Sequence, residues 1–131
     1  MKVYKTRLFA KWAAKEDLSD PKLMDAVDQM EKGILDAKLG AGLCKKRVAL
    51  DGSGKSGGVR TLIAFRKGDV AFFLYGFAKS ARANVNEKEE KALKLLAKTY
   101  FGMSDAQIGK AMKVGDLIEM IKEERDGKVD S

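Results

Sequence analysis

The stretch LCKKRVALDGSGKSGGVRTLIAFRKGDVAFFLYGFAKSAR, residues 43–82, decides the fold. It contains three runs rich in apolar and β-branched residues, at 43–50, 59–66 and 70–77, and such runs favour β-strands. The first two runs are separated by the glycine-rich loop DGSGKSGG, and the last two by Lys67-Gly68-Asp69, which is typical of a tight hairpin turn. Three successive strands joined in this way predict an antiparallel β-meander.

The two faces of the middle strand differ in charge. Side chains alternate across a strand, so positions 59, 61, 63 and 65 place three apolar residues and a threonine on one face. Arg60 and Arg66 lie on the other face. By the same rule Lys45 and Arg47 share a face of the preceding strand. We expect the apolar face to pack on the core and these four cations to form one open, positively charged surface.

The sequence before residue 43 predicts one strand and two helices. Residues 3–8 (VYKTRL) are β-prone, and residues 9–16 (FAKWAAKE) are typical of a short helix with Trp12 turned inward. Ser19-Asp20-Pro21 is a strong helix start, because it combines a capping side chain with a proline in the first turn. Apolar residues then recur at helical spacing as far as Gly33.

The sequence after residue 82 is predicted to be helical. Asn86 with Glu89, and Ser104 with Gln107, are capping-box patterns that mark two helix starts. A last amphipathic helical stretch is expected over residues 117–121. The whole chain of 131 residues is therefore expected to form one α+β domain, with a small antiparallel sheet, N-terminal helices packed on it and further C-terminal helices.

The positive charge of the chain is concentrated in its centre. The formal net charge is +7, and residues 37–82 alone carry ten basic and two acidic side chains. This concentration favours a polyanionic partner over a generally solvated surface. The lone Cys44, the absence of a signal-like apolar start and the shortness of the apolar runs predict a cytoplasmic protein that does not enter a membrane.

Two other functions that motifs suggest are disfavoured. Residues 49–56 (ALDGSGKS) fit a relaxed phosphate-binding loop, but a strand rather than a helix follows, so nucleotide binding is not expected. Residues 104–110 (SDAQIGK) have the composition of a DNA-reading helix. An ordinary capped helix explains them better, because Glu119, Glu123 and Glu124 nearby would repel DNA.

The central cations are suited to an RNA backbone. The residues in question are Lys45, Lys46, Arg47, Lys55, Arg60, Lys79 and Arg82. The chain has no histidine and one cysteine, so neither an imidazole acid–base pair nor a clustered metal site is predicted. If the protein cuts RNA, positioning, a lysine with a lowered pKa or a tyrosine must activate the 2′-hydroxyl. Arginines would then stabilise the charge on phosphorus.

Three segments carry a family resemblance. They are residues 42–49 (GLCKKRVA), 54–66 (GKSGGVRTLIAFR) and 72–84 (FFLYGFAKSARAN). In this order they resemble the RelE/HigB toxins of type II toxin–antitoxin systems, in the RelE/ParE superfamily. The likeness is particularly to the branch with a GKSGGxRTL loop and strand and a YGFAKxxRxN strand end. Residues 9–13 (FAKWA) and the helix around 92–97 fit as well.

The resemblance implies a RelE-like fold and an mRNA endonuclease that commonly acts on ribosome-bound message and is held inactive by a cognate antitoxin. It implies no metal or other cofactor. Carried over by position, Arg60 stabilises the phosphate, and Lys79 and Arg82 clamp the scissile region. The implied RNA-binding residues, some of which also act in proton transfer, are Lys45, Lys46, Arg47, Lys55 and Arg66.

The resemblance leaves two points open. Several relatives place a histidine or tyrosine near the C-terminus as acid or base, whereas here no histidine exists and Tyr100 falls in a predicted helix, so the base is unassigned. The superfamily also contains toxins that inhibit gyrase. A non-catalytic nucleic-acid-binding module and a gyrase inhibitor therefore stand beside the endoribonuclease.

Overall fold

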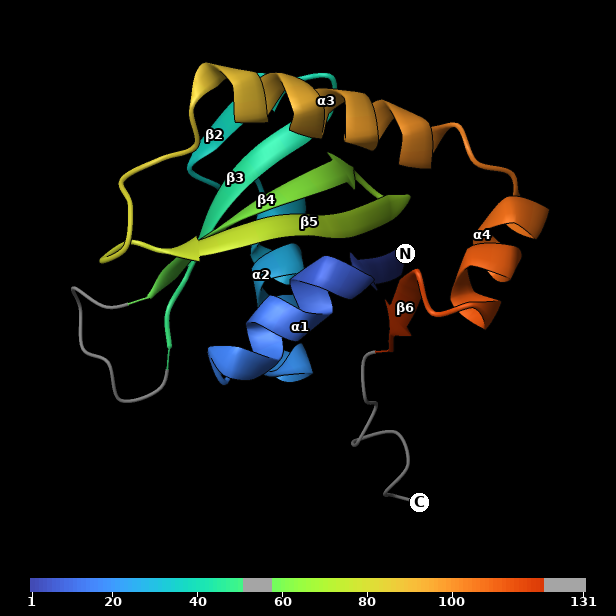
Figure 1. Ribbon diagram of the computed structural model, residues 1–131, viewed down its shortest axis with the longest axis horizontal. Helices are drawn as coiled ribbons and strands as arrows, with labels where there is room; N and C mark the ends of the chain where they lie inside the picture. Colours follow the sequence, from blue (N-terminus) through green and yellow to red (C-terminus); the bar gives the residue numbers. More distant parts are fainter. Residues whose placement is uncertain (51–57, 122–131) are drawn as a thin grey trace.

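The structure, a computed structural model, describes residues 1–50 and 58–121, and is built on one six-stranded sheet (Figure 1). The strands are β1 (Lys2–Thr6), β2 (Ala37–Gly40), β3 (Leu43–Val48), β4 (Val59–Arg66), β5 (Val70–Ala78) and β6 (Leu117–Met120). Their order across the sheet is β2-β3-β4-β5-β1-β6. Among these six described strands, β1 and β5 pair in parallel and every other neighbouring pair is antiparallel. The helices are α1 (Arg7–Lys15), α2 (Asp20–Glu31), α3 (Glu87–Phe101) and α4 (Asp105–Lys113).

The predicted meander is confirmed as β3, β4 and β5, each antiparallel to the next. The hairpin between β4 and β5 turns at Gly68, whose φ of +72° is the left-handed conformation that glycine adopts without strain. Residues 51–57 of the glycine-rich loop lie outside the described part of the chain, and β4 begins directly after it. A strand therefore follows this loop, as expected, where a phosphate-binding loop would need a helix.

Helices α1 and α2 cover one face of the sheet (Figure 1). The Thr6 side chain caps α1 by accepting a hydrogen bond from the backbone N–H of Phe9. Trp12 then packs directly over Gly76 of β5, where the ring leaves no room for a side chain on the glycine. The predicted inward position of Trp12 and the predicted helix start at Ser19 are both confirmed, although the Ser19 side chain makes no capping hydrogen bond within the described residues. The core on this face includes Phe73.

Helix α3 crosses the other face of the sheet, which corrects the expectation of an open cationic surface (Figure 1). Leu62 and Ala64 of β4 are both fully buried in a second apolar cluster with Phe72 and residues of α3. The alternation of β4 was predicted correctly, but both of its faces are buried. The α3 side of the sheet is therefore covered where Leu62 and Ala64 lie.

Residues 117–120 form a strand, so the prediction of a last helix was wrong. Both capping boxes of the preceding helices are present as expected, on α3 and on α4. After Gly115, whose φ is +82°, β6 pairs antiparallel with β1 at the edge of the sheet. Leu117 is buried in the α3-side cluster and Met120 in the cluster under α1 and α2, which a strand achieves because its side chains alternate.

The helices in the described part of the chain are all too short or too polar to cross a membrane.

Candidate nucleic-acid interface

Basic and aromatic side chains meet at the end of the sheet where β3 and β5 finish and β4 begins. The register places Arg47 of β3 opposite Arg60 of β4, and Arg60 opposite Phe77 of β5. In the next row, Leu62 lies between Lys45 and Tyr75. Both rows lie on the α3 side of the sheet, close to the start of α3. The predicted grouping of Lys45, Arg47 and Arg60 on one face is therefore confirmed.

Arg60 is partly buried in this row. Its Nη1 atom is buried and has no hydrogen-bond acceptor among the described residues. A buried polar group without a partner is costly, and the cost is greater for a charged one. Arg60 is thus a cation that an anionic ligand would stabilise, and the neighbouring Arg47 strengthens the local positive potential.

Arg82 is held beside the row by a network of hydrogen bonds. Its Nε donates to the Asn84 carbonyl oxygen at 2.9 Å, and Nη1 donates to the Tyr75 hydroxyl at 3.3 Å. Nη1 and Nη2 also donate to the two carboxylate oxygens of Glu89, at 2.9 and 2.6 Å. The hydrogen bond from Arg82 is the main cause that lowers the pKa of Glu89, and the same bond raises the pKa of Arg82. The guanidinium also lies 5.7 Å from the centre of the Phe77 ring.

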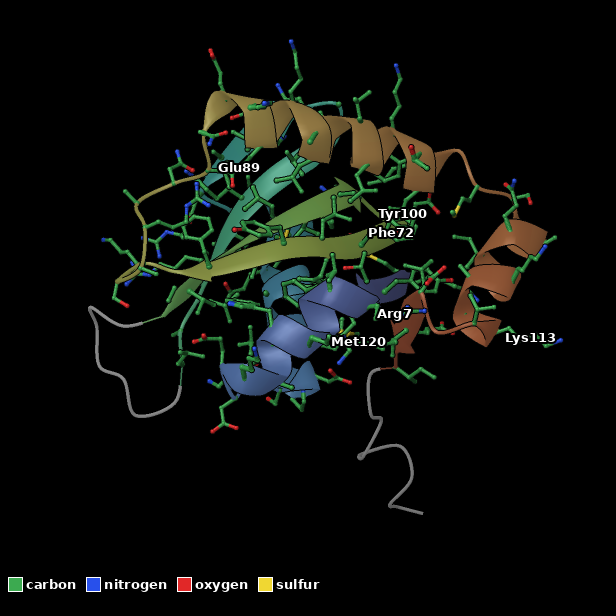
Figure 2. The ribbon with its side chains drawn as sticks, viewed as in Figure 1. Arg7, Phe72, Glu89, Tyr100, Lys113 and Met120 are labelled. Carbon is green, nitrogen blue, oxygen red and sulfur yellow. The ribbon has the colours of Figure 1, made fainter. Side chains whose placement is uncertain are left out.

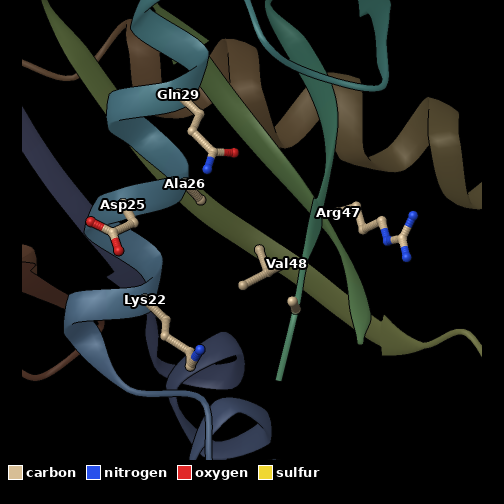
Figure 3. Close-up of a pocket in the computed structure, with 7 residues that line it drawn as sticks. Lys22, Asp25, Ala26, Gln29, Arg47 and Val48 are labelled. Atoms are coloured by element: carbon tan, nitrogen blue, oxygen red, sulfur yellow. The ribbon is translucent and has the colours of Figure 1, made fainter. Parts of the chain in front are cut away.

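Lys45, Arg47 and Lys79 lie at the same end of the sheet as these two arginines. Lys45 Nζ lies 3.4 Å from the side-chain oxygen of Asn84, the residue whose backbone carbonyl accepts from Arg82. Arg47 is exposed, and Figure 3 shows its side chain pointing away from α2. Lys79 is exposed in the turn that follows β5.

Lys46 does not belong to this group. It is 5% exposed on the opposite face of the sheet, where its Nζ donates to Gln29 Oε1 of α2 at 2.5 Å. Burial lowers the pKa of Lys46, and nearby Asp36 partly offsets that effect. Lys46 is therefore a lysine with a lowered pKa, but it faces α2 and not the cationic end of the sheet. Its predicted RNA-binding role does not agree with this position.

Arg66 and Tyr100 lie at the other end of the sheet. Arg66 is six residues along β4 from Arg60, which corresponds to about 20 Å. Its guanidinium stacks 4.2 Å from the centre of the Phe101 ring, and it pairs with Asp69 at 3.5 Å. Tyr100 stacks on Phe72, and Figure 2 shows it at the opposite end of α3 from Glu89. Burial raises the pKa of Tyr100, which makes the phenol a weaker acid. Neither residue joins the Arg60 group.

Lys55 lies in the part of the glycine-rich loop outside the described residues. Its predicted role stays a prediction. The chain on both sides of that loop leads into the cationic end of the sheet, because β3 ends and β4 begins there.

Tyr75 was missed by the sequence analysis as a site residue. It stands within the quoted segment 72–84, two residues before Phe77, and faces Arg82. The only signal in the sequence is its alternation with Phe77, which shares its side of β5. That signal is weak, because the register is irregular between the pair at Leu62 and the pair at Ile63.

Two hollows border this end of the sheet. One of about 150 Å³ lies between α2 and β3 and includes Gln29 and Val48 (Figure 3). A larger, mostly apolar groove of about 460 Å³ lies between α1 and the end of β5 and includes Tyr75 and Arg82. Within residues 1–50 and 58–121, no three His, Cys, Asp or Glu side chains come together in a way that would hold a metal ion.

Comparison with known proteins identifies the family. The family model described as RelE toxin of RelE / RelB toxin-antitoxin system matches residues 1–120. Comparison with curated proteins gives no match. The matched range contains every helix and strand described above, and the α+β architecture is consistent with a RelE-like fold. The chain therefore belongs to the RelE toxin family, whose members act with an antitoxin as partner.

Proposed function

We propose that this toxin is a metal-independent endoribonuclease that cleaves mRNA, in the cytoplasm and on the ribosome, and thereby inhibits translation. The observation that carries the proposal is the convergence of Arg60, Arg82 and Tyr75 at one end of the sheet. Arginines can stabilise the negative charge that develops on the phosphate, and a phenol can transfer a proton, without a histidine or a metal.

The chemistry starts with attack of an RNA 2′-hydroxyl on the adjacent phosphorus. The 2′-oxygen–phosphorus bond forms and the bond to the 5′-oxygen breaks. The 2′-hydroxyl loses its proton to solvent water, and the leaving 5′-oxygen gains a proton from a general acid, which solvent then reprotonates. Negative charge grows on the phosphate as the fifth bond forms. Arg60, with a buried nitrogen that lacks an acceptor in the described chain, and Arg82 beside it are suited to stabilise that charge.

Tyr75 is suited to donate the proton to the leaving 5′-oxygen. Arg82 donates a hydrogen bond to the Tyr75 oxygen, so the hydrogen of the phenol is left to point elsewhere. Glu89 is a poor alternative acid or base, because the hydrogen bond from Arg82 lowers its pKa. We assign Tyr75 the role of general acid.

Tyr75→Phe should lower the cleavage rate by about 10²-fold, the usual contribution of a general acid or base. The ring and its packing remain, and only the hydroxyl that accepts from Arg82 is lost. RNA affinity should stay unchanged. The measurement is single-turnover cleavage of a labelled RNA, together with an equilibrium titration.

Tyr100→Phe is the matched control for that variant. It removes a phenol hydroxyl on the same side of the sheet but at the far end of α3, about 16 Å along the helix from Glu89. Its cleavage rate should equal that of the unmodified chain. A Tyr75→Phe rate that equals the Tyr100→Phe rate would remove Tyr75 from the mechanism.

Lys45, Arg47, Lys55 and Lys79 are proposed to bind the phosphates on either side of the cut. Lys45→Met should weaken RNA binding and reduce the log–log salt slope by about 0.7, the value for one phosphate contact of a single strand. Lys46→Met is the neighbouring control, because Lys46 faces α2. It should leave the slope unchanged. If Lys45→Met and Lys46→Met have equal salt slopes, RNA does not bind specifically to the face of the sheet that carries Lys45.

The proposed function is tested by incubating the purified chain with a translating ribosome complex and, separately, with naked RNA, and mapping cut positions in each. Cuts in ribosome-bound message support the proposal. RNA binding without cuts in either sample would identify a binding module instead. Inhibition of gyrase supercoiling without RNA cleavage would identify the other kind of toxin in the superfamily.

A further inference from the structure

Glu89 binds the Arg82 guanidinium in the way that a phosphate would. A guanidinium has five N–H donors, and four of those of Arg82 are used within the protein. The pair with Glu89 is bidentate, because Nη1 and Nη2 each donate to a different carboxylate oxygen, and arginine binds a phosphate in the same way. Among the residues that the structure describes, one N–H of Arg82 is left without an acceptor, so a bidentate phosphate contact requires Glu89 to give way.

Glu89 has a second partner that remains when Arg82 is released. Its Oε1 atom accepts a hydrogen bond from the backbone N–H of Asn86 at 2.8 Å, which closes the capping box of α3. Figure 2 shows Glu89 at the first turn of that helix. The carboxylate therefore stays anchored at the start of α3 with or without the arginine. Exchange of Arg82 from Glu89 to RNA does not require the helix to unfold.

The ion pair is also accessible. The side chains of Arg82 and Glu89 are 32% and 36% exposed, so an RNA strand lying on the end of the sheet can reach the guanidinium. An exposed pair of this kind is screened by salt and is weak enough to be exchanged for another anion.

We infer that Glu89 is a built-in competitor for the RNA phosphate at Arg82, and that it sets the RNA affinity of the toxin. The inference rests on the proposed function, since it takes RNA as the ligand of Arg82. Glu89 is in this sense a positioning residue that tunes substrate binding through Arg82 and does not touch the reacting atoms.

Glu89→Gln tests this directly, because it removes the charge and keeps the cap. Glutamine serves as the third residue of a capping box in this same protein, where Gln107 pairs with Ser104. We expect RNA affinity to rise by about 3- to 5-fold at low salt. The salt slope should steepen by about 0.7 for the added phosphate contact. The probe is a 2′-O-methyl oligouridine, which lacks the attacking hydroxyl and so reports binding without cleavage.

Glu87→Gln is the matched control. Glu87 lies in the same first turn of α3, is exposed, and is not an acceptor of Arg82. It loses the same charge and should leave affinity and slope close to those of the unmodified chain. With cleavable RNA, Glu89→Gln should lower KM by the same factor as it lowers Kd and leave kcat within about 2-fold, the pattern of a change in binding alone.

A double variant tests whether the effect of Glu89→Gln depends on Arg82. When Arg82→Ala is already present, Glu89→Gln should no longer tighten RNA binding, because the competed cation is gone. Equal affinities of Glu89→Gln and Glu87→Gln would overturn the inference and leave Glu89 as a cap only. Weaker binding by Glu89→Gln would also overturn it. Absence of RNA binding by the unmodified chain would instead overturn the proposed function, and this is seen before any variant is compared.

Discussion

Replacing Arg60 and Arg82 together with alanine should lower the RNA cleavage rate by at least about 10³-fold, since the loss of one preorganised donor to a developing negative charge costs about 10²–10³. Arg60 brings a buried nitrogen that has no acceptor in the described chain, and Arg82 brings a guanidinium held beside Tyr75. The expected cellular result is that expression of the unmodified chain stops growth and shortens transcripts, while the double variant does neither. The rate is measured in single-turnover reactions with the purified proteins.

A charge-matched control separates the site from the overall charge of the chain. Lys98→Ala with Lys113→Ala removes two exposed cations from the last turns of α3 and α4, far from Arg60; Figure 2 shows Lys113 on α4. This variant should stay toxic and active. Thermal unfolding curves of both variants establish that each is folded. Toxicity of the arginine double variant equal to that of the lysine control would remove the proposed site.

Phe72→Ala should lower the free energy of unfolding by about 3–5 kcal/mol, the usual cost of truncating a buried phenylalanine. Phe72 is 2% exposed and lies at the centre of an aromatic cluster on the α3 side of the sheet. Its ring stacks on Tyr4 at 5.2 Å and on Tyr100 at 5.0 Å, and meets the edge of Phe101 at 6.2 Å. Phe72 thus joins β1 and β5 to α3.

Urea or guanidinium denaturation measures this change. Leu95→Ala is the control, because Leu95 lies on α3 but is 63% exposed and should contribute little. A loss of less than about 1 kcal/mol for Phe72→Ala would mean that α3 is not anchored through this cluster. The same result would argue against the position of Glu89 beside Arg82, because Glu89 is part of α3.

The meander was predictable because it depends on local signals, whereas the pairing register between its strands comes from the structure. Three apolar runs, a glycine turn at Gly68 and the alternation of side chains place Arg47, Arg60 and Lys45 on one face, and the structure agrees. The same alternation places Lys46 on the face opposite to Lys45. The prediction that Lys46 binds RNA beside Lys45 therefore disagreed with the alternation of the strand. The charge of a residue does not reveal which face it lies on.

What covers a sheet face was not predictable in the same way. Leu62 and Ala64 indicate an apolar face, but only the tertiary structure shows α3 lying across them. Arg82 contacts Tyr75, seven residues before it, and Glu89, seven residues after it. Neither contact follows from the periodicity of a helix or a strand, because the turn after β5 brings these residues together. The helix predicted for residues 117–120 was wrong for another reason. Short apolar runs fit helix and strand equally, and pairing with β1 decides the outcome.

We propose that arginines and a tyrosine cleave RNA without a metal, through the 2′-hydroxyl. The most direct test is to digest a defined RNA with the purified chain in excess EDTA, with ribosomes and without, and to determine the chemical nature of the new ends. Cleavage should persist in EDTA and should leave a 2′,3′-cyclic phosphate and a 5′-hydroxyl. Cleavage that requires magnesium and leaves a 3′-hydroxyl with a 5′-phosphate, or no cleavage in either sample, would contradict it.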